Sequence, residues 1–332
     1  MRNLILGISI VLVGLLTACG GRNGGDAKYE IAVIPKSVSF DFWNTVHVGA
    51  QAAAAELDSV RISWKGTSDE TDIAGQVQIV ESFINQGVDA IVIAAADARG
   101  LVPVLRRAKE SGVVVITIDS NTDPQISESF IATDNVDAAR KAAELVAESL
   151  NGEGEVAVIP YIAGASTSND RERGFKEGIQ GYEGITVVAT QYSQSDHSRA
   201  MAVTEDLLTA YPDLDAIFGA NEPSVIGAAQ AVKSRGLTDR ITLVGFDASP
   251  QEIEGVRSGV IKGLIVQDPF RMGYEGVVQA VAVLNGEAVS ERIDSGSIVV
   301  TRENLDEFLE RREQEMTGST ADRDTSFADV SE

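Results

Sequence analysis

Short apolar runs alternate with longer amphipathic segments through most of the chain. The segments at 44–57, 73–84 and 134–150 carry apolar residues at the helical period, and Asp134 is placed to cap the third of them. The apolar runs are rich in β-branched residues, as in strands that are buried on both faces of a parallel sheet. They cover residues 30–35, 88–95, 112–119, 154–160, 184–191, 215–221, 241–247 and 263–268. This alternation predicts an α/β protein with doubly wound sheets.

The letters AVIP occur twice, at 32–35 and at 157–160, each time at the end of a predicted strand. A loop and then a helix follow each copy, so the chain resembles two versions of one βα design. Ligands of doubly wound sheets lie beyond the carboxyl ends of the strands. We therefore expect two domains that face each other and enclose a cleft.

Length and charge narrow the class of protein. A chain of 332 residues usually divides into two domains, and its 44% hydrophobic content is ordinary for a globular protein. The formal charge of −23, from 50 acidic and 27 basic residues, repels phosphate backbones and argues against nucleic-acid binding. The same acidic excess suits either a secreted protein or a high-salt habitat, and composition does not choose between them.

The N-terminus has the pattern of a targeting segment. Arg2 precedes an apolar run at 4–16, which is shorter than the ~20 residues that a membrane-spanning helix needs. The run ends in LTAC followed by two glycines, which resembles the lipobox of bacterial lipoproteins. We therefore expect a signal peptide at 1–19 and a lipid anchor on Cys19, the only cysteine of the chain. The alternative is an unmodified cysteine in an ordinary signal peptide.

The segments that flank the predicted domains are polar. Residues 20–28 are rich in glycine and predict a flexible tether. Residues 311–332 contain one aromatic residue and many serine, threonine and acidic residues, so we expect a disordered acidic tail there.

Polar and aromatic side chains gather at the ends of the predicted strands. Three aromatic residues, Phe40, Phe42 and Trp43, follow the first strand. Planar amide, carboxylate and guanidinium groups and short hydroxyls follow later strands: Asp119, Ser120, Arg171, Ser195, Asn221, Asp247 and Gln267. A sugar needs both kinds of group, because its hydroxyls both donate and accept hydrogen bonds while its C–H faces lie on aromatic rings. The pattern predicts a sugar site.

Each of these residues also has a purely structural interpretation. Aspartates between strand and helix, such as Asp119 and Asp247, are common caps. Arg171 could form a solvated ion pair with nearby glutamates. Phe42 and Trp43 could both be core residues, although neighbours on a helix point about 100° apart. Asn221 and Gln267 are the hardest to explain without a ligand, because a buried amide needs hydrogen-bond partners.

Together these motifs resemble the periplasmic sugar-binding proteins of the ribose-binding type, which are related to the ligand domain of the LacI regulators. The resemblance covers residues 29–300 and rests on VITIDS at 115–120, IATDN at 131–135, RERGF at 171–175, LVGFDASP at 243–250 and GLIVQDPFRMGYEGV at 263–277. It implies a type I periplasmic binding protein, in which two doubly wound parallel-sheet domains are joined by a three-strand hinge. The implied N-terminal lobe is 29–132 plus 268–295, and the C-terminal lobe is 133–267 plus 296–310.

The resemblance also implies roles for the residues at the strand ends. Phe42 and Trp43 match the pair that sandwiches the sugar ring from the first domain. The residues that match hydroxyl-binding positions are Asp119, Asn221, Asp247 and Gln267. An alignment on Phe175 places Asn169 at the family's ligand-contacting arginine and leaves Arg171 as a shifted substitute.

Three positions depart from the family pattern. Phe40 stands where an asparagine is usual, Ser120 replaces an arginine, and Ser195 replaces an aromatic residue. These departures argue against ribose and favour another monosaccharide or a related polyol.

The implied function is capture of a sugar by hinge closure, followed by delivery to the permease of an ATP-binding cassette importer. We expect a monomer without cofactor or metal, anchored by its lipid to the periplasmic or extracellular face of the cell envelope. An alternative partner is a chemoreceptor or a histidine-kinase ectodomain. An enzyme acting on glycosides would need Asp119 and Asp247 as its carboxylate pair. A histidine-rich metal site or a histidine-based catalytic triad is not expected, because His47 and His197 are the only histidines.

Overall fold

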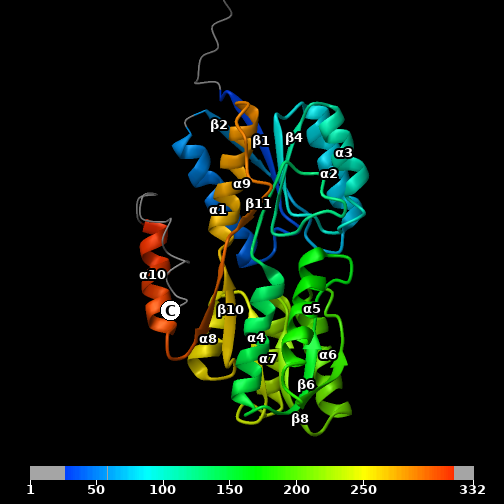
Figure 1. Ribbon diagram of the computed structural model, residues 1–332, viewed down its shortest axis with the longest axis vertical. Coiled ribbons are helices and arrows are strands. Elements are labelled where there is room, and N and C mark those ends of the chain that lie inside the picture. Colours follow the sequence, from blue (N-terminus) through cyan, green and yellow to red (C-terminus); the bar gives the residue numbers. More distant parts are fainter. Residues whose placement is uncertain (1–26, 58, 318–332) are drawn as a thin grey trace, which may run out of the picture.

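The computed structural model describes residues 27–57 and 59–317, which form two sheets, one above the other in Figure 1. The first sheet has six parallel strands in the order β11-β5-β4-β3-β1-β2. Its strands are β1 (Tyr29–Ile34), β2 (Val60–Trp64), β3 (Ala90–Ile93), β4 (Val114–Ile118), β5 (Ser129–Ala132) and β11 (Arg292–Asp294). We call this sheet and the helices that cover it the N-terminal lobe.

The second sheet repeats this design with one antiparallel edge strand. Its order is β12-β10-β9-β8-β6-β7, and only the β10–β12 pair is antiparallel. Its strands are β6 (Glu153–Ile159), β7 (Gly184–Thr190), β8 (Leu214–Gly219), β9 (Thr242–Phe246), β10 (Gly263–Gln267) and β12 (Ser297–Thr301). This sheet and its helices form the C-terminal lobe.

Helices cover both faces of each sheet because the strand residues alternate between two apolar clusters. In β1, Ile31 and Val33 pack into one cluster while Ala32 and Ile34 pack into the other. The N-terminal lobe contains α1 (Asp41–Glu56), α2 (Ile73–Gln86), α3 (Val102–Glu110) and α9 (Pro269–Leu284). The C-terminal lobe contains α4 (Asn135–Ser149), α5 (Ser166–Ile179), α6 (His197–Ala210), α7 (Glu222–Ser234), α8 (Pro250–Ser258) and α10 (Leu305–Thr317). The predicted doubly wound fold class is confirmed.

The chain crosses between the lobes at three places, which form the hinge of this fold. The crossovers run from β5 to α4, from β10 to α9 and from β11 to β12. Hydrogen bonds tie the first and third crossovers together: Thr133 Oγ1 donates to the Gly296 carbonyl at 3.0 Å, and the Asp134 N–H donates to Asp294 Oδ1 at 3.1 Å. Asp134 also caps α4 as predicted, because its side chain accepts from Val136 and Asp137 N–H groups.

The C-terminal helix corrects one prediction. Residues 311–317, which were predicted to be disordered, belong to α10. The helix is held because Leu305 and Phe308 are buried in an apolar cluster and Arg312 donates to the Ala248 carbonyl at 2.9 Å. The predicted signal peptide, most of the tether and residues 318–332 lie outside the described residues, whereas Lys28 is held by Asn285 at 3.0 Å. Within the described part of the chain no helix has the length and apolar character to cross a membrane.

Helices α1 and α9 touch backbone to backbone through two glycines. A Cβ added at Gly49 would lie 2.0 Å from the Phe270 carbonyl oxygen, and one added at Gly273 would lie 2.0 Å from the Val46 carbonyl oxygen. These contacts leave no space for any side chain. They fix the middle of α1 against α9.

Gly49→Ala is expected to lower the free energy of unfolding by about 1–3 kcal/mol, because the added methyl group overpacks a backbone contact. Urea denaturation measures this change. The exposed Val48 on the same helix provides the control, and Val48→Ala should stay within about 0.5 kcal/mol of wild type. A Gly49→Ala protein as stable as this control would contradict the packing argument.

Candidate functional site

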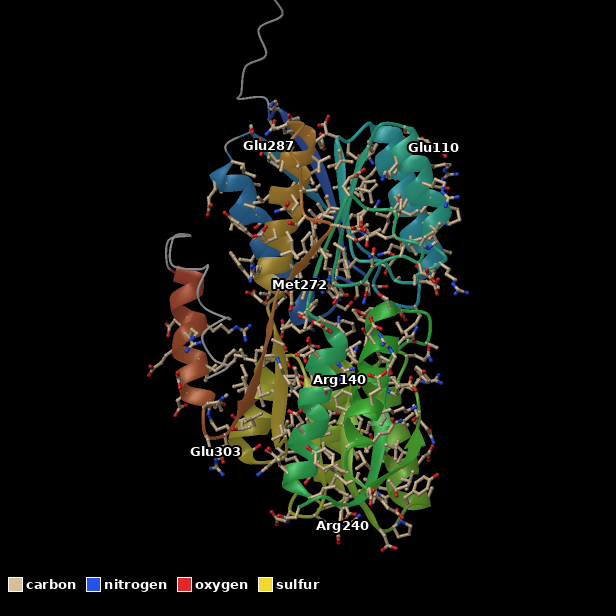
Figure 2. The ribbon with its side chains drawn as sticks, in the orientation of Figure 1. Glu110, Arg140, Arg240, Met272, Glu287 and Glu303 are labelled. Atoms are coloured by element: carbon tan, nitrogen blue, oxygen red, sulfur yellow. The ribbon has the colours of Figure 1, made fainter. Side chains whose placement is uncertain are left out.

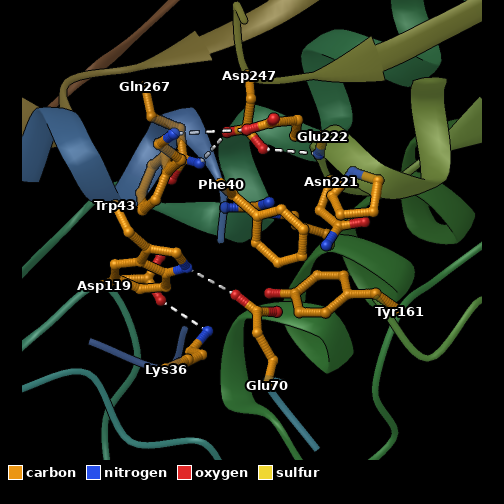
Figure 3. Close-up of a pocket in the computed structure, with 13 residues that line it drawn as sticks. Lys36, Phe40, Trp43, Glu70, Asp119, Tyr161, Asn221, Glu222, Asp247 and Gln267 are labelled. Atoms are coloured by element: carbon orange, nitrogen blue, oxygen red, sulfur yellow. Dashed lines mark hydrogen bonds and ion pairs between the residues drawn. The ribbon is translucent and has the colours of Figure 1, made fainter. Parts of the chain in front are cut away.

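A cavity lies between the two lobes, and side chains from both of them line it (Figure 3). Lys36 follows β1, Asp119 follows β4, Tyr161 follows β6 and Asp247 follows β9, while Gln267 is the last residue of β10. The topology therefore brings the carboxyl ends of five strands to one place, as expected for doubly wound sheets. The full lining is Lys36, Phe40, Phe42, Trp43, Glu70, Asp119, Tyr161, Arg171, Asn221, Glu222, Pro223, Asp247 and Gln267.

Two of the strand-end carboxylates sit on left-handed backbone. Asp119 has a φ of 55° and Asp247 a φ of 80°, a region that residues other than glycine rarely adopt. Such conformations cost free energy and cluster at binding sites. They occur here at equivalent positions of the two lobes, where each turns a carboxylate into the cavity.

Lys36 and Asp119 form a buried ion pair at the floor of the N-terminal lobe. Lys36 Nζ lies 2.7 Å from Asp119 Oδ2, and the two side chains are 2% and 4% exposed. Burial alone lowers the pKa of Lys36, but the negative charge of Asp119, with Tyr161 and Glu70 nearby, holds that pKa above its ordinary value. Lys36 is therefore a charged donor, and it also donates to Thr167 Oγ1 of the C-terminal lobe at 3.1 Å.

Glu70 links the lobes through a chain of hydrogen bonds. Its two carboxylate oxygens accept from Trp43 Nε1 at 2.8 Å and from Ser195 Oγ at 2.7 Å. Ser195 in turn accepts from Asn221 Nδ2 at 2.8 Å. Burial raises the pKa of Glu70, and the charge of Lys36 opposes that shift. This series of hydrogen bonds joins α1 in one lobe to the start of α7 in the other.

The opposite wall is acidic. Asp247 accepts from Gln267 Nε2 at 2.6 Å and from the Glu222 N–H at 2.9 Å. Burial raises the pKa of Asp247, and the charge of Arg171 opposes the shift. Burial and the charge of Asp247 together raise the pKa of Glu222 to about 7. The other amide atom, Gln267 Oε1, is buried and has no hydrogen-bond partner among the described residues, so it is available to a ligand donor.

Arg171 is the guanidinium that reaches the cavity. Its Nε donates to Asn135 Oδ1 at 2.7 Å, and one terminal nitrogen donates to the Ala220 carbonyl at 2.8 Å. Its Cζ lies over the Phe246 ring, 4.1 Å from the centroid. Asn169 was predicted to bind ligand, but it is exposed on α5 and does not line the cavity. The two residues are two positions apart on a helix, so their side chains point in nearly opposite directions.

Phe42 and Trp43 both line the cavity, but not as a sandwich. Their ring centroids are 4.9 Å apart with an interplanar angle of 89°, so the rings touch each other edge to face. Trp43 is 2% exposed and packs in the cluster that contains Val46 and Met272, which is labelled in Figure 2. The pair forms two adjoining walls, and Trp43 belongs to the core as well as to the cavity.

Of the remaining predicted residues, one lines the cavity and two do not. Phe40 lines the cavity and packs edge to face against His197 of the other lobe, with centroids 5.9 Å apart. Ser120 and Ser195 are buried but do not line the cavity. Ser120 Oγ instead donates to Asp119 Oδ2 at 2.9 Å, and Ser195 supports Glu70.

The sequence patterns missed four lining residues that carry ionisable groups. Lys36 and Tyr161 directly follow the two AVIP copies, so the internal repeat marked both of them. Glu222 follows the predicted Asn221. Glu70 lies beyond β2, a short and half-exposed strand that the apolar pattern did not indicate, and no local signal pointed to it.

Two doubly wound lobes, three crossovers and a polar, aromatic-walled cavity between them define a two-lobed ligand-binding protein of the type I periplasmic class. The chain belongs to the periplasmic binding protein domain family, whose model matches residues 31–288. This membership confirms the family that the motifs predicted.

Curated relatives and solved structures agree with that family. The D-ribose/D-allose-binding protein of Pseudomonas aeruginosa is 31% identical over 274 residues, which cover 80% of this chain and 86% of that protein. A carbohydrate transporter solute-binding protein from Agrobacterium radiobacter, solved with D-arabinose, has a TM-score of 0.83 and 34% identity, covering 86% of this chain and 98% of that one. An ABC transporter solute-binding protein from Agrobacterium vitis, solved with D-fucose, has a TM-score of 0.81 and 38% identity, with 83% and 97% coverage.

Lys36→Met is expected to lower the free energy of unfolding by about 3–5 kcal/mol, because it leaves the Asp119 carboxylate buried without its cation. Urea denaturation at pH 7 measures the loss. The control is Arg107→Met, which removes an ion pair with Glu81 whose side chains are 56% and 42% exposed, and which should cost less than about 1 kcal/mol. Equal losses in the two variants would mean that burial does not strengthen the Lys36 pair.

Proposed function

We propose that this protein is an extracytoplasmic solute-binding lipoprotein that captures a neutral monosaccharide or polyol by hinge closure and delivers it to an ABC importer. The observation that carries this proposal is the lining of the cavity. Carboxylates, amides, a lysine and an arginine from both lobes face one space beside Phe42 and Trp43. A polyhydroxylated ligand with an apolar face can contact both the polar and the aromatic groups.

The charges of the cavity favour an uncharged ligand. Four carboxylates line it, Glu70, Asp119, Glu222 and Asp247, and two cations, Lys36 and Arg171. Both cations are already engaged, since Lys36 is paired with Asp119 and Arg171 is held by Asn135 and the Ala220 carbonyl. An anionic sugar would meet excess negative charge in a site of low dielectric.

Closure of the lobes would follow from contacts that span them. The proposed moving lobes, 29–132 plus 268–295 and 133–267 plus 296–310, each contain one sheet. Hydrogen bonds from Lys36 to Thr167 and from Ser195 to Glu70 join the two lobes across the cleft. Ligand contacts to both walls add to these and shift the population toward the closed state.

The importer is favoured over a sensor or an enzyme. Relatives of this chain are named ribose import binding proteins and ABC transporter solute-binding proteins. Asp119 is ion-paired to Lys36 and Asp247 accepts from two donors, so each carboxylate is held in place as a hydrogen-bond acceptor. These contacts suit binding without turnover.

Binding of a neutral sugar should raise the melting temperature, because the ligand binds only the folded protein. We expect at least one of D-ribose, D-allose, D-arabinose and D-fucose to give a shift on the order of 5 °C at saturation. A fluorescence thermal-shift screen measures it. D-glucuronate and D-ribose 5-phosphate serve as charged controls and should give no shift. A screen in which no sugar, polyol or cyclitol stabilises the protein would contradict the proposal.

We propose in addition that Cys19 carries a lipid, as its LTACGG setting indicates. Residues 20–26 then connect the anchor to the first strand. Cys19→Ala should abolish incorporation of an alkyne-tagged palmitate in the producing bacterium and move the protein from the membrane to the soluble fraction. The control Asn23→Ala lies beyond the motif and should keep both labelling and membrane association. Labelling that survives Cys19→Ala would exclude this anchor.

A further inference from the structure

Helix α1 begins without a cap from its own lobe. Phe40 occupies the N-cap position with extended backbone, φ −120° and ψ 151°, and no side chain of its own turn accepts a hydrogen bond there. The first N–H groups of a helix need an acceptor, which serine, threonine, aspartate or asparagine usually supplies. A phenyl ring has none to offer. The helix that carries Phe42 and Trp43 therefore lacks a local acceptor at the end that faces the cavity.

The missing acceptor comes from the other lobe. Glu222 Oε2 accepts from the Phe42 N–H at 3.4 Å, and the backbone of Asp41 also interacts with this carboxylate. Glu222 itself is firmly placed: it opens α7, its N–H donates to Asp247, and Asn221 caps the same helix by accepting from Ser224 N–H at 3.2 Å. A rigid element of one lobe thus holds a carboxylate against the helix end of the other.

We propose that Glu222 is a positioning residue that caps α1 across the cleft, so that the first turn of α1, which carries Phe42, is fixed for the ligand only when the lobes are closed. The edge-to-face contact between Phe40 and His197 of α6 closes the same side of the cleft with an apolar surface. The proposal rests on the sugar-binding function proposed above. It also implies that closure of the lobes is coupled to protonation of Glu222.

The groups around Glu222 set the direction of the pH effect. Asp247 after β9 and Asp41 on α1 add negative charge around it. Glu252 on α8 interacts with Glu222 as well, and burial together with the charge of Asp247 raises the pKa of Glu252 well above its ordinary value. Arg171 on α5 acts on Asp247, and His197 on α6, whose own pKa is lowered by burial, packs against Phe40. Burial and the charge of Asp247 raise the pKa of Glu222 to about 7.

Opening the lobes exposes Glu222 to water and moves its pKa back toward its ordinary value near 4.5. Closure therefore takes up a proton between these two values. The closed state is favoured fully below the ordinary pKa, and this contribution is lost as the pH rises through about 7. A protonated carboxyl group still has an accepting oxygen for the Phe42 N–H.

The test is calorimetric titration of the purified protein with the tightest-binding sugar of the panel above, from pH 5 to 8.5. We expect affinity to fall by up to about tenfold per pH unit between pH 5 and 7 and then to level off. Titrations at pH 6.5 in two buffers of different ionisation enthalpy should show net proton uptake on binding.

Two substitutions of Glu222 distinguish the effect of its charge from the effect of its hydrogen bond to the start of α1. Glu222→Gln keeps an accepting oxygen and cannot ionise, so it should bind at pH 8 at least as tightly as wild type binds at pH 5, with no proton uptake. Glu222→Ala removes the cap and should bind about fivefold more weakly at low pH. Glu70→Gln is the comparison, since Glu70 is the other buried cleft carboxyl that joins the lobes, and this variant should retain the step near pH 7.

The outcomes distinguish this inference from the function on which it rests. If wild type binds sugar but Glu222→Gln keeps the wild-type pH profile and proton uptake, the cross-lobe cap is wrong while the binding function stands. Wild-type affinity in Glu222→Ala at low pH would also overturn the cap. If wild type binds none of the sugars, the proposed function fails and the cap proposal fails with it.

Discussion

The buried ion pair between Lys36 and Asp119 sets the character of the whole cleft. A charge that is removed from water must be paired and hydrogen-bonded, or it does not remain charged. Here the pair is completed by Ser120 on the carboxylate and by Thr167 on the ammonium group. Because Thr167 belongs to the other lobe, the requirement to satisfy one buried charge already reaches across the cleft. The floor of the cavity is thereby polar and shared between the lobes.

The same groups join the lobes and line the cavity. Glu70 accepts from Trp43 within its lobe and from Ser195 across the cleft. A ligand hydroxyl that enters this space both donates and accepts, so it can replace a contact between lobes without leaving a buried group unpaired. A ligand with too few hydroxyls would leave carboxylates unsatisfied, at a cost of several kcal/mol for each buried group. Selectivity for polyhydroxylated molecules thus follows from the network itself.

The sequence predicts the fold well where the signal is local and strong. Buried runs such as 88–95 have a continuous apolar character, and the repeated AVIP marks both lobes. The edge strands β2 and β11 are short and partly exposed, so their pattern is weak. Helix α10 was missed in part because tertiary contacts of Phe308 and Arg312, rather than composition, hold its polar segment.

The sequence could predict those site residues that lie at the ends of strands. Asp119 and Asp247 directly follow strands and Gln267 ends one, and these positions bring all three side chains to the cavity. Asn169 does not line the cavity, because the helix turns Arg171, two positions further on, inward instead. Glu70 and Glu222 act on partners that are distant in the sequence, and such contacts exist only in the folded chain.

Phe40 departs from the family pattern, and this departure changes which lobe supplies the hydrogen-bond acceptor at the start of α1. A polar residue at that position would cap α1 locally, in the open and the closed protein alike. Phe40 cannot, so the end of the helix is completed by Glu222 of the other lobe, and the apolar ring packs on His197 beside it. The first turn of α1 is thereby stabilised by a contact between the lobes and not by a capping residue in its own sequence. Any group that changes the charge of Glu222 then acts on closure through the start of this helix.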